Sequence, residues 1–300
     1  MQLVSYRTQG DTERNWRAGV EHDGRIVDVT TLWHDGVHET TTRQLLTAGS
    51  ANVRRVFGQA REVLDADTAA PEVFQVASIE LGPPVPDPDK IICIGVNYAD
   101  HAAEAKIAPT EVPVLFAKFR NALTGPSSAI LLPRVSREID YEGELAVVIG
   151  QRCKEVPASE ALDYVAGYSV FNDVSARDLQ MQTSQWVAGK ALDTFAPMGP
   201  GIIPTSEIPD PQTLQLRTRV NGVTLQDAST AQMIFPVTEL IAFISSIMTL
   251  EPGDIIATGT PSGVGFKRSP PIYLTAGDIV EVEIERVGRI RNHVLGPVNP

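Results

Sequence analysis

The sequence is poor in residues that could cross-link it or bind metal through sulfur. Only two cysteines, Cys93 and Cys153, occur in 300 residues. This count excludes a multi-bridge disulfide framework and a four-cysteine zinc site. Each cysteine lies in or beside an apolar run, so we expect two buried, reduced thiols.

Positive charge and long apolar runs are also scarce. The formal net charge is −12, which argues against nucleic acid or an anionic membrane as partner, because both require a basic surface. No run approaches the roughly 20 apolar residues of a membrane span. The longest, 237–250, contains Glu239 and two serines and predicts a core-facing helix. No targeting segment is visible, so a cytoplasmic location is the default expectation.

Several common catalytic motifs are missing. The sequence has no GxSxG elbow, no HExxH pair and no GxxxxGK[ST] loop. The glycine-rich segment 259–265 does not have GxGxxG spacing. The sequence therefore lacks the signatures of an α/β-hydrolase serine enzyme, a zinc protease, a P-loop and a nicotinamide site.

A proline-rich segment divides the chain. Four prolines fall within residues 83–88, and proline excludes both helix interiors and central strands. We therefore predict a small N-terminal domain over 1–82, a stiff linker over 83–89 and a larger domain over 90–300.

Strand patterns outnumber helix patterns in the larger part. Strands are predicted at 2–6, 16–21, 25–29, 90–96, 130–132, 145–149, 166–172, 214–220, 254–257 and 278–284. Helices are predicted at 42–48, 51–65, 98–106, 159–162, 175–182 and 235–249. Asn221 and Gly222 predict a tight hairpin. This pattern favours an α+β fold, a rolled mixed β-sheet with a small N-terminal α/β domain.

Three acidic residues are candidate metal ligands. Glu142 and Glu144 lie two residues apart at the start of an apolar strand, so both would face one side. Asp173 follows another apolar run. Two buried carboxylates repel each other, and a hard cation such as Mg²⁺ or Mn²⁺ removes that penalty. The alternatives are a solvated strand face for the glutamates and a helix N-cap for Asp173.

A histidine and a lysine are candidate catalytic groups. His101 and Glu104 are three apart on a predicted helix, where a carboxylate can fix the imidazole tautomer and make it a base. Lys190 lies among small and apolar residues, so burial would require an anionic partner. A surface ion pair and a surface loop lysine are the alternatives. The glycine-rich loop 259–265 is either an anion-binding nest or a plain loop.

Five motifs in order resemble the fumarylacetoacetate hydrolase family. They are Ile-Gly-Val-Asn-Tyr (94–98), Asp-Tyr-Glu-Gly-Glu-Leu (140–145), Asn-Asp-Val-Ser-Ala-Arg-Asp (172–178), Gly-Lys-Ala-Leu-Asp-Thr-Phe (189–195) and Gly-Thr-Pro-Ser-Gly-Val-Gly (259–265). The resemblance covers residues 90 to about 294. It implies a β-roll, a homodimer and an Mg²⁺ or Mn²⁺ site.

The resemblance also implies roles for individual residues. The metal ligands would be Glu142, Glu144 and Asp173. The catalytic residues would be His101, Glu104 and Lys190, with the first two on a closing lid. The residues facing a small 2-oxo acid substrate would be Gly259, Thr260, Arg177 and Gln180.

The implied reaction is hydrolysis of the C3–C4 bond of 2,4-dioxo acids of the acylpyruvate or fumarylpyruvate type, through a metal-stabilised pyruvate enolate. The same enolate would serve an oxaloacetate decarboxylase, or an isomerase or hydratase of hydroxymuconate-type intermediates in aromatic degradation. A non-catalytic binding protein is a third hypothesis. Clustered carboxylates speak against it, because they cost stability unless a ligand neutralises them.

Overall fold

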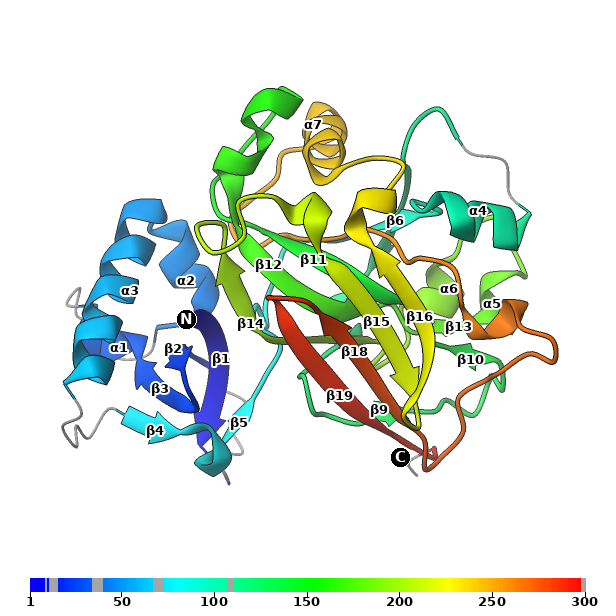
Figure 1. The fold of residues 1–300 in the computed structure, drawn as a ribbon, viewed down its shortest axis with the longest axis horizontal. Helices are drawn as coiled ribbons and strands as arrows, with labels where there is room; N and C mark the ends of the chain where they lie inside the picture. Colours follow the sequence, from blue (N-terminus) through cyan, green and yellow to red (C-terminus); the bar gives the residue numbers. More distant parts are fainter. Residues whose placement is uncertain (9, 11–15, 34–39, 67–72, 107–109, 298–300) are drawn as a thin grey trace.

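Two large sheets form the framework of the molecule. The computed structural model describes residues 1–8, 10, 16–33, 40–66, 73–106 and 110–297. A twelve-stranded sheet has the order β4-β3-β2-β1-β14-β12-β11-β17-β6-β7, with β5 paired to β1 and β8 to β14. A five-stranded sheet has the order β16-β15-β18-β19-β9 (Figure 1). The mixed sheets and few helices confirm the α+β prediction.

The N-terminal part contributes the first five strands and three helices. The strands are β1 (Gln2–Thr8), β2 (Arg17–His22), β3 (Arg25–Asp28), β4 (Val73–Gln75) and β5 (Ile79–Leu81). The helices are α1 (Val29–Leu32), α2 (Thr42–Thr47) and α3 (Ser50–Asp65), with a 3₁₀ turn η1 (Val76–Ser78).

The larger part supplies the remaining strands. Those in the large sheet are β6 (Ile91–Gly95), β7 (Val114–Lys118), β8 (Leu123–Thr124), β11 (Gly143–Ile149), β12 (Val165–Asn172), β14 (Ala196–Pro204) and β17 (Ile255–Ala257). The five-stranded sheet has β9 (Ile130–Leu131), β15 (Gln215–Val220), β16 (Val223–Ser229), β18 (Ile279–Ile284) and β19 (Gly288–Leu295). β10 (Ile139–Asp140) pairs with β13 (Ser175–Ala176).

Helices in the larger part are short apart from α7. They are α4 (Ala99–Ala105), α5 (Arg177–Gln180), α6 (Val187–Lys190) and α7 (Val237–Ile247). The 3₁₀ turns are η2 (Arg120–Ala122), η3 (Ala158–Tyr164), η4 (Pro211–Thr213), η5 (Thr230–Gln232) and η6 (Gly265–Lys267). α7 buries one apolar face, as its sequence predicts. No helix among the described residues is long and apolar enough to cross a membrane.

Strand β11 shows why its sequence is apolar throughout. Every residue from Gly143 to Ile149 is buried. Leu145 and Val147 pack into a core shared with β15, β18 and α7, whereas Ala146 and Val148 pack into a second core. That second core also contains side chains of α2 and α3, so apolar packing is continuous across the proline-rich segment. The domain boundaries at 82 and 90 stay a prediction.

Two predicted helices take other forms. Residues 158–164 form the 3₁₀ turn η3. Residues 175–182 begin as strand β13, and only Arg177–Gln180 is helical. Asp173 therefore does not cap a helix starting at Val174, and the capping alternative is wrong. The hairpin at Asn221 and Gly222 is confirmed, since both have positive φ and join β15 to β16. Cys93 and Cys153 are buried and free, as expected.

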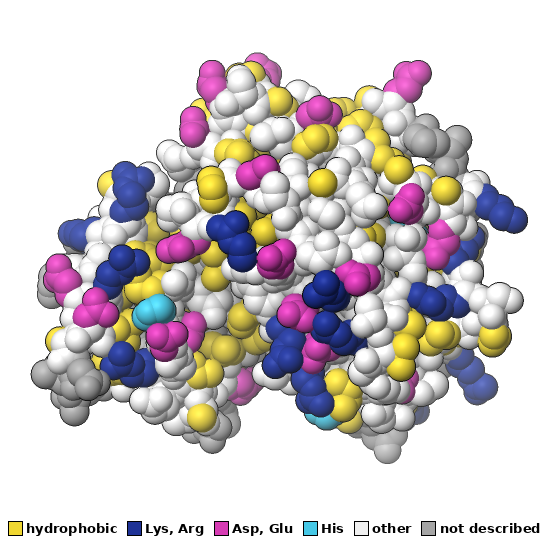
Figure 2. All heavy atoms as spheres, viewed as in Figure 1, with side chains coloured by type: hydrophobic (Ala, Val, Ile, Leu, Met, Phe, Trp, Pro, Cys, Tyr) yellow, Lys and Arg dark blue, Asp and Glu magenta, His cyan; other side chains and the backbone are white. Residues whose placement is uncertain are grey.

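Acidic and basic side chains are mixed on the visible face of the molecule (Figure 2). On the five-stranded sheet, Arg219 contacts Glu281 at 3.0 Å and Glu283 at 2.7 Å, and Arg289 contacts Glu281 at 3.4 Å. Such partly exposed pairs contribute little to stability. They do provide control positions away from the buried charges described below.

A buried carboxylate stabilises the N-terminal strands. Asp28 accepts hydrogen bonds from the Tyr6 hydroxyl at 2.6 Å and from the Thr30 amide at 2.7 Å, and it pairs with Arg17. Burial raises the pKa of Tyr6 to about 12, although the charge of Arg17 opposes this rise. The phenol therefore keeps its proton and donates the hydrogen bond to Asp28. Asp28 therefore links β1, β2 and the start of α1.

Replacing Asp28 with alanine removes this link. We expect a loss of about 2–4 kcal/mol in the free energy of unfolding, from the lost cap and the unpaired buried donors. Urea denaturation checks this, with Asp65→Ala at the exposed end of α3 as control. Equal stability of the two variants would contradict the assigned role of Asp28.

Candidate active site

The three predicted metal ligands converge where β11 begins and β12 ends. Glu142 directly precedes β11, Glu144 is its second residue, and Asp173 directly follows β12. Because these strands are antiparallel, with Gly143 opposite Asn172, their ends are adjacent. One carboxylate oxygen from each residue lies within 4.8 Å of the others, and all three side chains are buried. The alternative of a solvated glutamate face is wrong.

Lys190 lies between two of these carboxylates. Its Nζ is 2.6 Å from Glu142 Oε2 and 2.6 Å from Asp173 Oδ2. The side chain is 2% exposed, so the surface-loop alternative is wrong. Burial opposes the ammonium charge, but Asp173 and Glu142 outweigh it and raise the pKa of Lys190. Lys190 is therefore a buried cation at neutral pH.

A second buried lysine escaped the sequence analysis. Lys118, the last residue of β7, places its Nζ 2.7 Å from Asp173 Oδ1. It also donates to the carbonyls of Val174 at 2.9 Å and Phe195 at 2.8 Å, and to that of Lys190. Its position at the end of an apolar run was the available signal. Lys118 holds Asp173 and the backbone at Lys190 together.

Arg177 connects the ligand Glu142 to another buried carboxylate that was missed, Asp140. Its Nη2 is 2.5 Å from Glu142 Oε1 and 2.8 Å from Asp140 Oδ2. Its Nη1 donates to Gln180 Oε1 at 3.0 Å. Burial opposes ionisation of Glu142, but Arg177 and Lys190 outweigh it, so the pKa of Glu142 is lowered.

Glu144 is poorly compensated. Burial raises its pKa well above the ordinary value, and the charges of Asp173 and Glu142 add to that effect. The cluster as a whole contains four buried acidic side chains and three buried basic ones: Asp140, Glu142, Glu144 and Asp173, and Lys118, Arg177 and Lys190. Three convergent carboxyl groups with more acidic than basic side chains around them suit a hard dication. The residues present therefore fit a divalent metal site.

The glycine-rich loop supplies amides to the protein's own carboxylates. Gly259 N–H donates to Glu144 Oε2 at 2.8 Å, Gly263 to Glu104 Oε1 at 3.0 Å and Gly265 to Asp140 Oδ1 at 2.7 Å. Each of these amides meets a different side chain, so an anion-binding nest in this loop stays a prediction. Gly259 has φ +97°, and a Cβ there would lie 2.7 Å from Asn97 Cβ. A role for Gly259 in substrate binding stays a prediction.

Thr260 is anchored in the same loop. Its hydroxyl donates to the Gly143 carbonyl at 2.9 Å and accepts from Gln226 Nε2 at 2.8 Å. The loop is thereby fixed to the first residue of β11. Contact between Thr260 and substrate stays a prediction.

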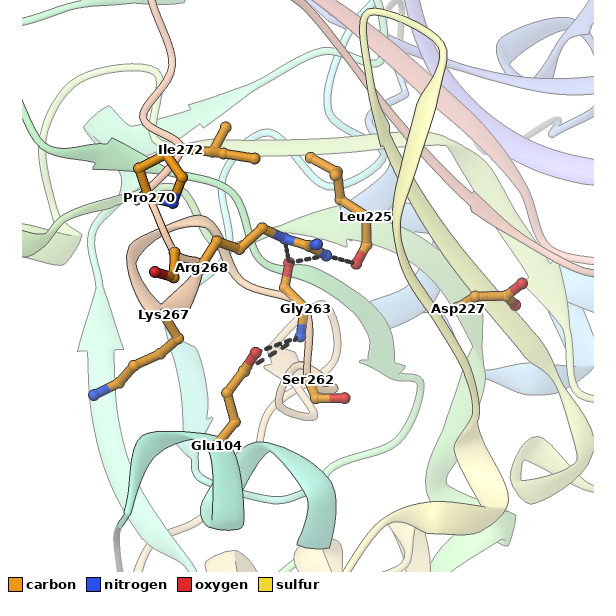
Figure 3. Close-up of a pocket in the computed structure, with 10 residues that line it drawn as sticks. Glu104, Leu225, Asp227, Ser262, Gly263, Lys267, Arg268, Pro270 and Ile272 are labelled. Carbon is orange, nitrogen blue, oxygen red and sulfur yellow. Dashed lines mark hydrogen bonds between the residues drawn. The ribbon is translucent and has the colours of Figure 1, made fainter.

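His101 and Glu104 form the predicted pair on α4. His101 Nδ1 lies 3.3 Å from Glu104 Oε2. The two face different spaces. His101 lines a cavity of about 50 Å³ with Glu142, Glu144, Lys190 and Thr260. Glu104 lines a neighbouring hollow of about 680 Å³, where its carboxylate meets the Gly263 amide (Figure 3).

The small cavity collects most of the predicted residues. Its wall includes the following, all named from sequence: His101, Glu142, Glu144, Arg177, Gln180, Lys190 and Thr260. It also includes the aromatic rings of Phe116, Trp186 and Phe266. Carboxylates, an ammonium and an imidazole thus surround one space, an arrangement suited to stabilising an enolate and moving its proton.

Several relatives of the chain are named oxaloacetate tautomerase. It is 39% identical over 297 residues to a mitochondrial oxaloacetate tautomerase of Xenopus laevis, covering 98% of this chain and 90% of that one. It is 43% identical over 273 residues to a mitochondrial oxaloacetate tautomerase of Rattus norvegicus, covering 91% and 84%.

Solved structures of similar fold include enzymes of related chemistry. A fumarylacetoacetate hydrolase of Exiguobacterium antarcticum is 36% identical over 99% of both chains, with a TM-score of 0.82. A maleylpyruvate hydrolase of Sphingobium, in complex with manganese(II) and pyruvate, is 30% identical over 99% and 100%, with a TM-score of 0.79. The family description "Fumarylacetoacetate (FAA) hydrolase C-terminal" matches residues 90–295. The chain is an enzyme that belongs to the fumarylacetoacetate hydrolase family.

Proposed function

We propose that the protein interconverts the keto and enol forms of oxaloacetate. The observation that carries this is the shared cavity, where the His101 imidazole, the Lys190 ammonium and the carboxylate cluster lie together. The sequence alone favoured hydrolysis of acylpyruvates. Relatives named oxaloacetate tautomerase favour the alternatives on the same enolate over hydrolysis, and they point to an isomerisation of oxaloacetate itself, which the sequence analysis did not name. Mg²⁺ or Mn²⁺ and a homodimeric assembly remain part of the proposal.

The chemistry is a proton transfer between carbon and oxygen. His101, oriented by Glu104, takes a proton from C3 of the keto form. Lys190 donates a hydrogen bond to the oxygen on C2 as negative charge develops there. The protonated His101 then delivers the proton it took from C3 to that oxygen, which gives the enol and returns the imidazole to its starting form. A divalent cation held by Glu142, Glu144 and Asp173 would polarise the C2 carbonyl and make the C3 proton more acidic. No water is consumed and no carbon–carbon bond breaks.

The assay follows the ultraviolet absorbance of enol-oxaloacetate with purified protein and Mg²⁺ or Mn²⁺. We expect faster loss of the enol signal than in buffer with the same metal, abolished by EDTA. Pyruvate and CO₂ are measured in parallel. Release of both at the rate of enol loss would instead identify a decarboxylase and reject the proposal.

Hydrolysis of acylpyruvates is the second candidate. The His101–Glu104 pair could deprotonate a water as well as a C–H bond, and a structural neighbour is a maleylpyruvate hydrolase. A panel of acylpyruvates separates the two reactions. Pyruvate release from the panel without acceleration of oxaloacetate tautomerisation would favour hydrolysis.

Replacing His101 with glutamine removes the proposed proton carrier. We expect kcat for tautomerisation to fall about a hundredfold, the low end for loss of a general base. Metal affinity, measured by calorimetry, should stay within about twofold because His101 is not among the three ligands. The exposed His293 provides a control as His293→Gln. Unchanged turnover in His101→Gln would exclude His101 as the base.

A further inference from the structure

Arg268 lies in the hollow beside the active-site cavity and has no assigned role in the reaction. Its Nη2 donates to the Leu225 carbonyl at 2.5 Å. Nε and Nη2 also reach the Gly263 carbonyl at 3.4 Å and 3.3 Å. Figure 3 shows the guanidinium aimed at these two oxygens. Arg268 thus ties the glycine-rich loop to strand β16.

Gly263 is the point where this loop meets the catalytic pair. Its carbonyl also accepts a hydrogen bond from the Tyr141 hydroxyl at 3.0 Å. Its amide donates to Glu104 Oε1 at 3.0 Å and Oε2 at 3.2 Å. The Gly263 carbonyl and amide belong to two peptide planes that are joined at one Cα, so their directions are coupled through the φ and ψ angles of Gly263.

The backbone at Gly263 leaves no room for a side chain. Its φ is +100°, and a Cβ would lie 2.1 Å from the Leu225 carbonyl oxygen. Only glycine fits this close approach. Gly263 therefore lies in close contact with β16, and Arg268 bonds to the carbonyls on both sides of that contact.

We propose that Arg268 is a positioning residue for catalysis. Through Gly263 it holds the Glu104 carboxylate against His101, and so it sets the orientation of the imidazole. This inference rests on the proposed function, in which His101 moves the substrate proton. It concerns geometry, because Arg268 itself lies outside the wall of the substrate cavity.

The positive charge of Arg268 also favours the Glu104 carboxylate that its hydrogen bonds help to position. Burial opposes ionisation of Glu104, but hydrogen bonds from His101 and Gly263 and the charges of His101 and Arg268 outweigh it, so the pKa of Glu104 is lowered. An ionised carboxylate is the partner that fixes an imidazole tautomer.

Kinetics of Arg268→Met test the inference. This variant keeps the apolar stem and removes the donors. We expect kcat to fall roughly tenfold through misplacement of His101, with KM and Mn²⁺ affinity within about twofold. Arg268→Lys, which keeps the charge, should recover part of kcat. Arg289→Met, which removes a surface pair, should match wild type. Unchanged kcat in Arg268→Met would overturn the inference.

An NMR measurement is independent of activity. The ¹⁵N signals of His101 in the Mg²⁺-loaded protein, assigned with His101→Gln, report its tautomer. They should show a fixed tautomer in wild type and a tautomer mixture in Arg268→Met. A wild-type protein without tautomerase activity would contradict the proposed function but would not decide the role of Arg268. In that case the His101 signals still test the inference. Unchanged signals in Arg268→Met would overturn it, and altered signals would support it.

Tyr141→Phe keeps the test valid if Arg268→Met does not fold. It removes the other side-chain donor to the Gly263 carbonyl and preserves the buried ring. We expect the same direction of change in kcat and in the His101 signals, but smaller. If a folded Tyr141→Phe protein has the same kcat and the same His101 signals as wild type, Gly263 does not determine the orientation of His101.

Discussion

A Glu144→Gln variant is expected to lose metal binding and activity while the metal-free protein becomes more stable. Glu144 is one of three buried ligands, so Mn²⁺ affinity should fall at least about a hundredfold. Turnover should fall about a thousandfold or more, because Lewis-acid stabilisation contributes several kcal/mol. Calorimetric titration and the enol-oxaloacetate assay measure these two effects.

The gain in stability follows from the raised pKa of Glu144, which burial and the charges of Asp173 and Glu142 produce. Between the ordinary carboxyl pKa and the raised one, the folded state holds a proton that the unfolded state has released. The stability of the metal-free wild type therefore falls as pH rises through that window. Glutamine does not titrate, so the Glu144→Gln variant should lack this fall in stability with rising pH.

Thermal unfolding in EDTA at several pH values checks the second half of the prediction. At neutral pH we expect Tm to rise by roughly 2 °C for each kcal/mol of relieved repulsion. Glu283→Gln, on the outer sheet, serves as the control for loss of a partly exposed charge. A Glu144→Gln protein less stable than wild type in EDTA would contradict the charge imbalance assigned to the site.

Replacing Lys190 with methionine should have the second-largest effect. The ammonium contacts Glu142 and Asp173 at 2.6 Å each. Its removal leaves buried carboxylates with less compensation, which should cost about 3–5 kcal/mol in the metal-free protein. kcat should fall about a hundred- to a thousandfold with the loss of one donor to the developing oxyanion. Denaturation and steady-state kinetics provide the two measurements.

The metal should recover part of the lost stability of Lys190→Met, because a dication can neutralise the same carboxylates. Unfolding midpoints with and without Mg²⁺ should therefore differ more in this variant than in wild type. Lys154→Met, at a partly exposed lysine on the surface, provides the matched control. Full activity in Lys190→Met would contradict the role of the Lys190 ammonium in stabilising the developing oxyanion.

The sequence predicted the centre of the site better than its surroundings. Glu142, Glu144 and Asp173 stand out because carboxylates at the ends of apolar strands are costly unless they share a ligand. Lys118 and Asp140 are equally buried, but each makes its contacts through elements far away in the chain. Nothing near them in sequence indicates which oxygens or amides they meet.

Three of the strands that escaped prediction, β13, β14 and β19, have identifiable causes. β14 contains Pro197, Pro200 and Pro204, which removes the usual strand pattern, and its pairing with β12 shifts register. β19 alternates buried and exposed residues but contains two arginines, an asparagine and a histidine among its eight residues. Segment 175–182 has helical spacing, but its first two residues pair with β10 instead. Tertiary pairing overrode local propensity there.

The most direct test of the account is calorimetric titration of metal-stripped protein with Mn²⁺, for wild type and Glu144→Gln side by side. Three convergent carboxylates predict one saturable site per chain in wild type and its loss in the variant. Absence of saturable binding to wild type, or equal binding by both proteins, would contradict the claim that these side chains hold a catalytic dication.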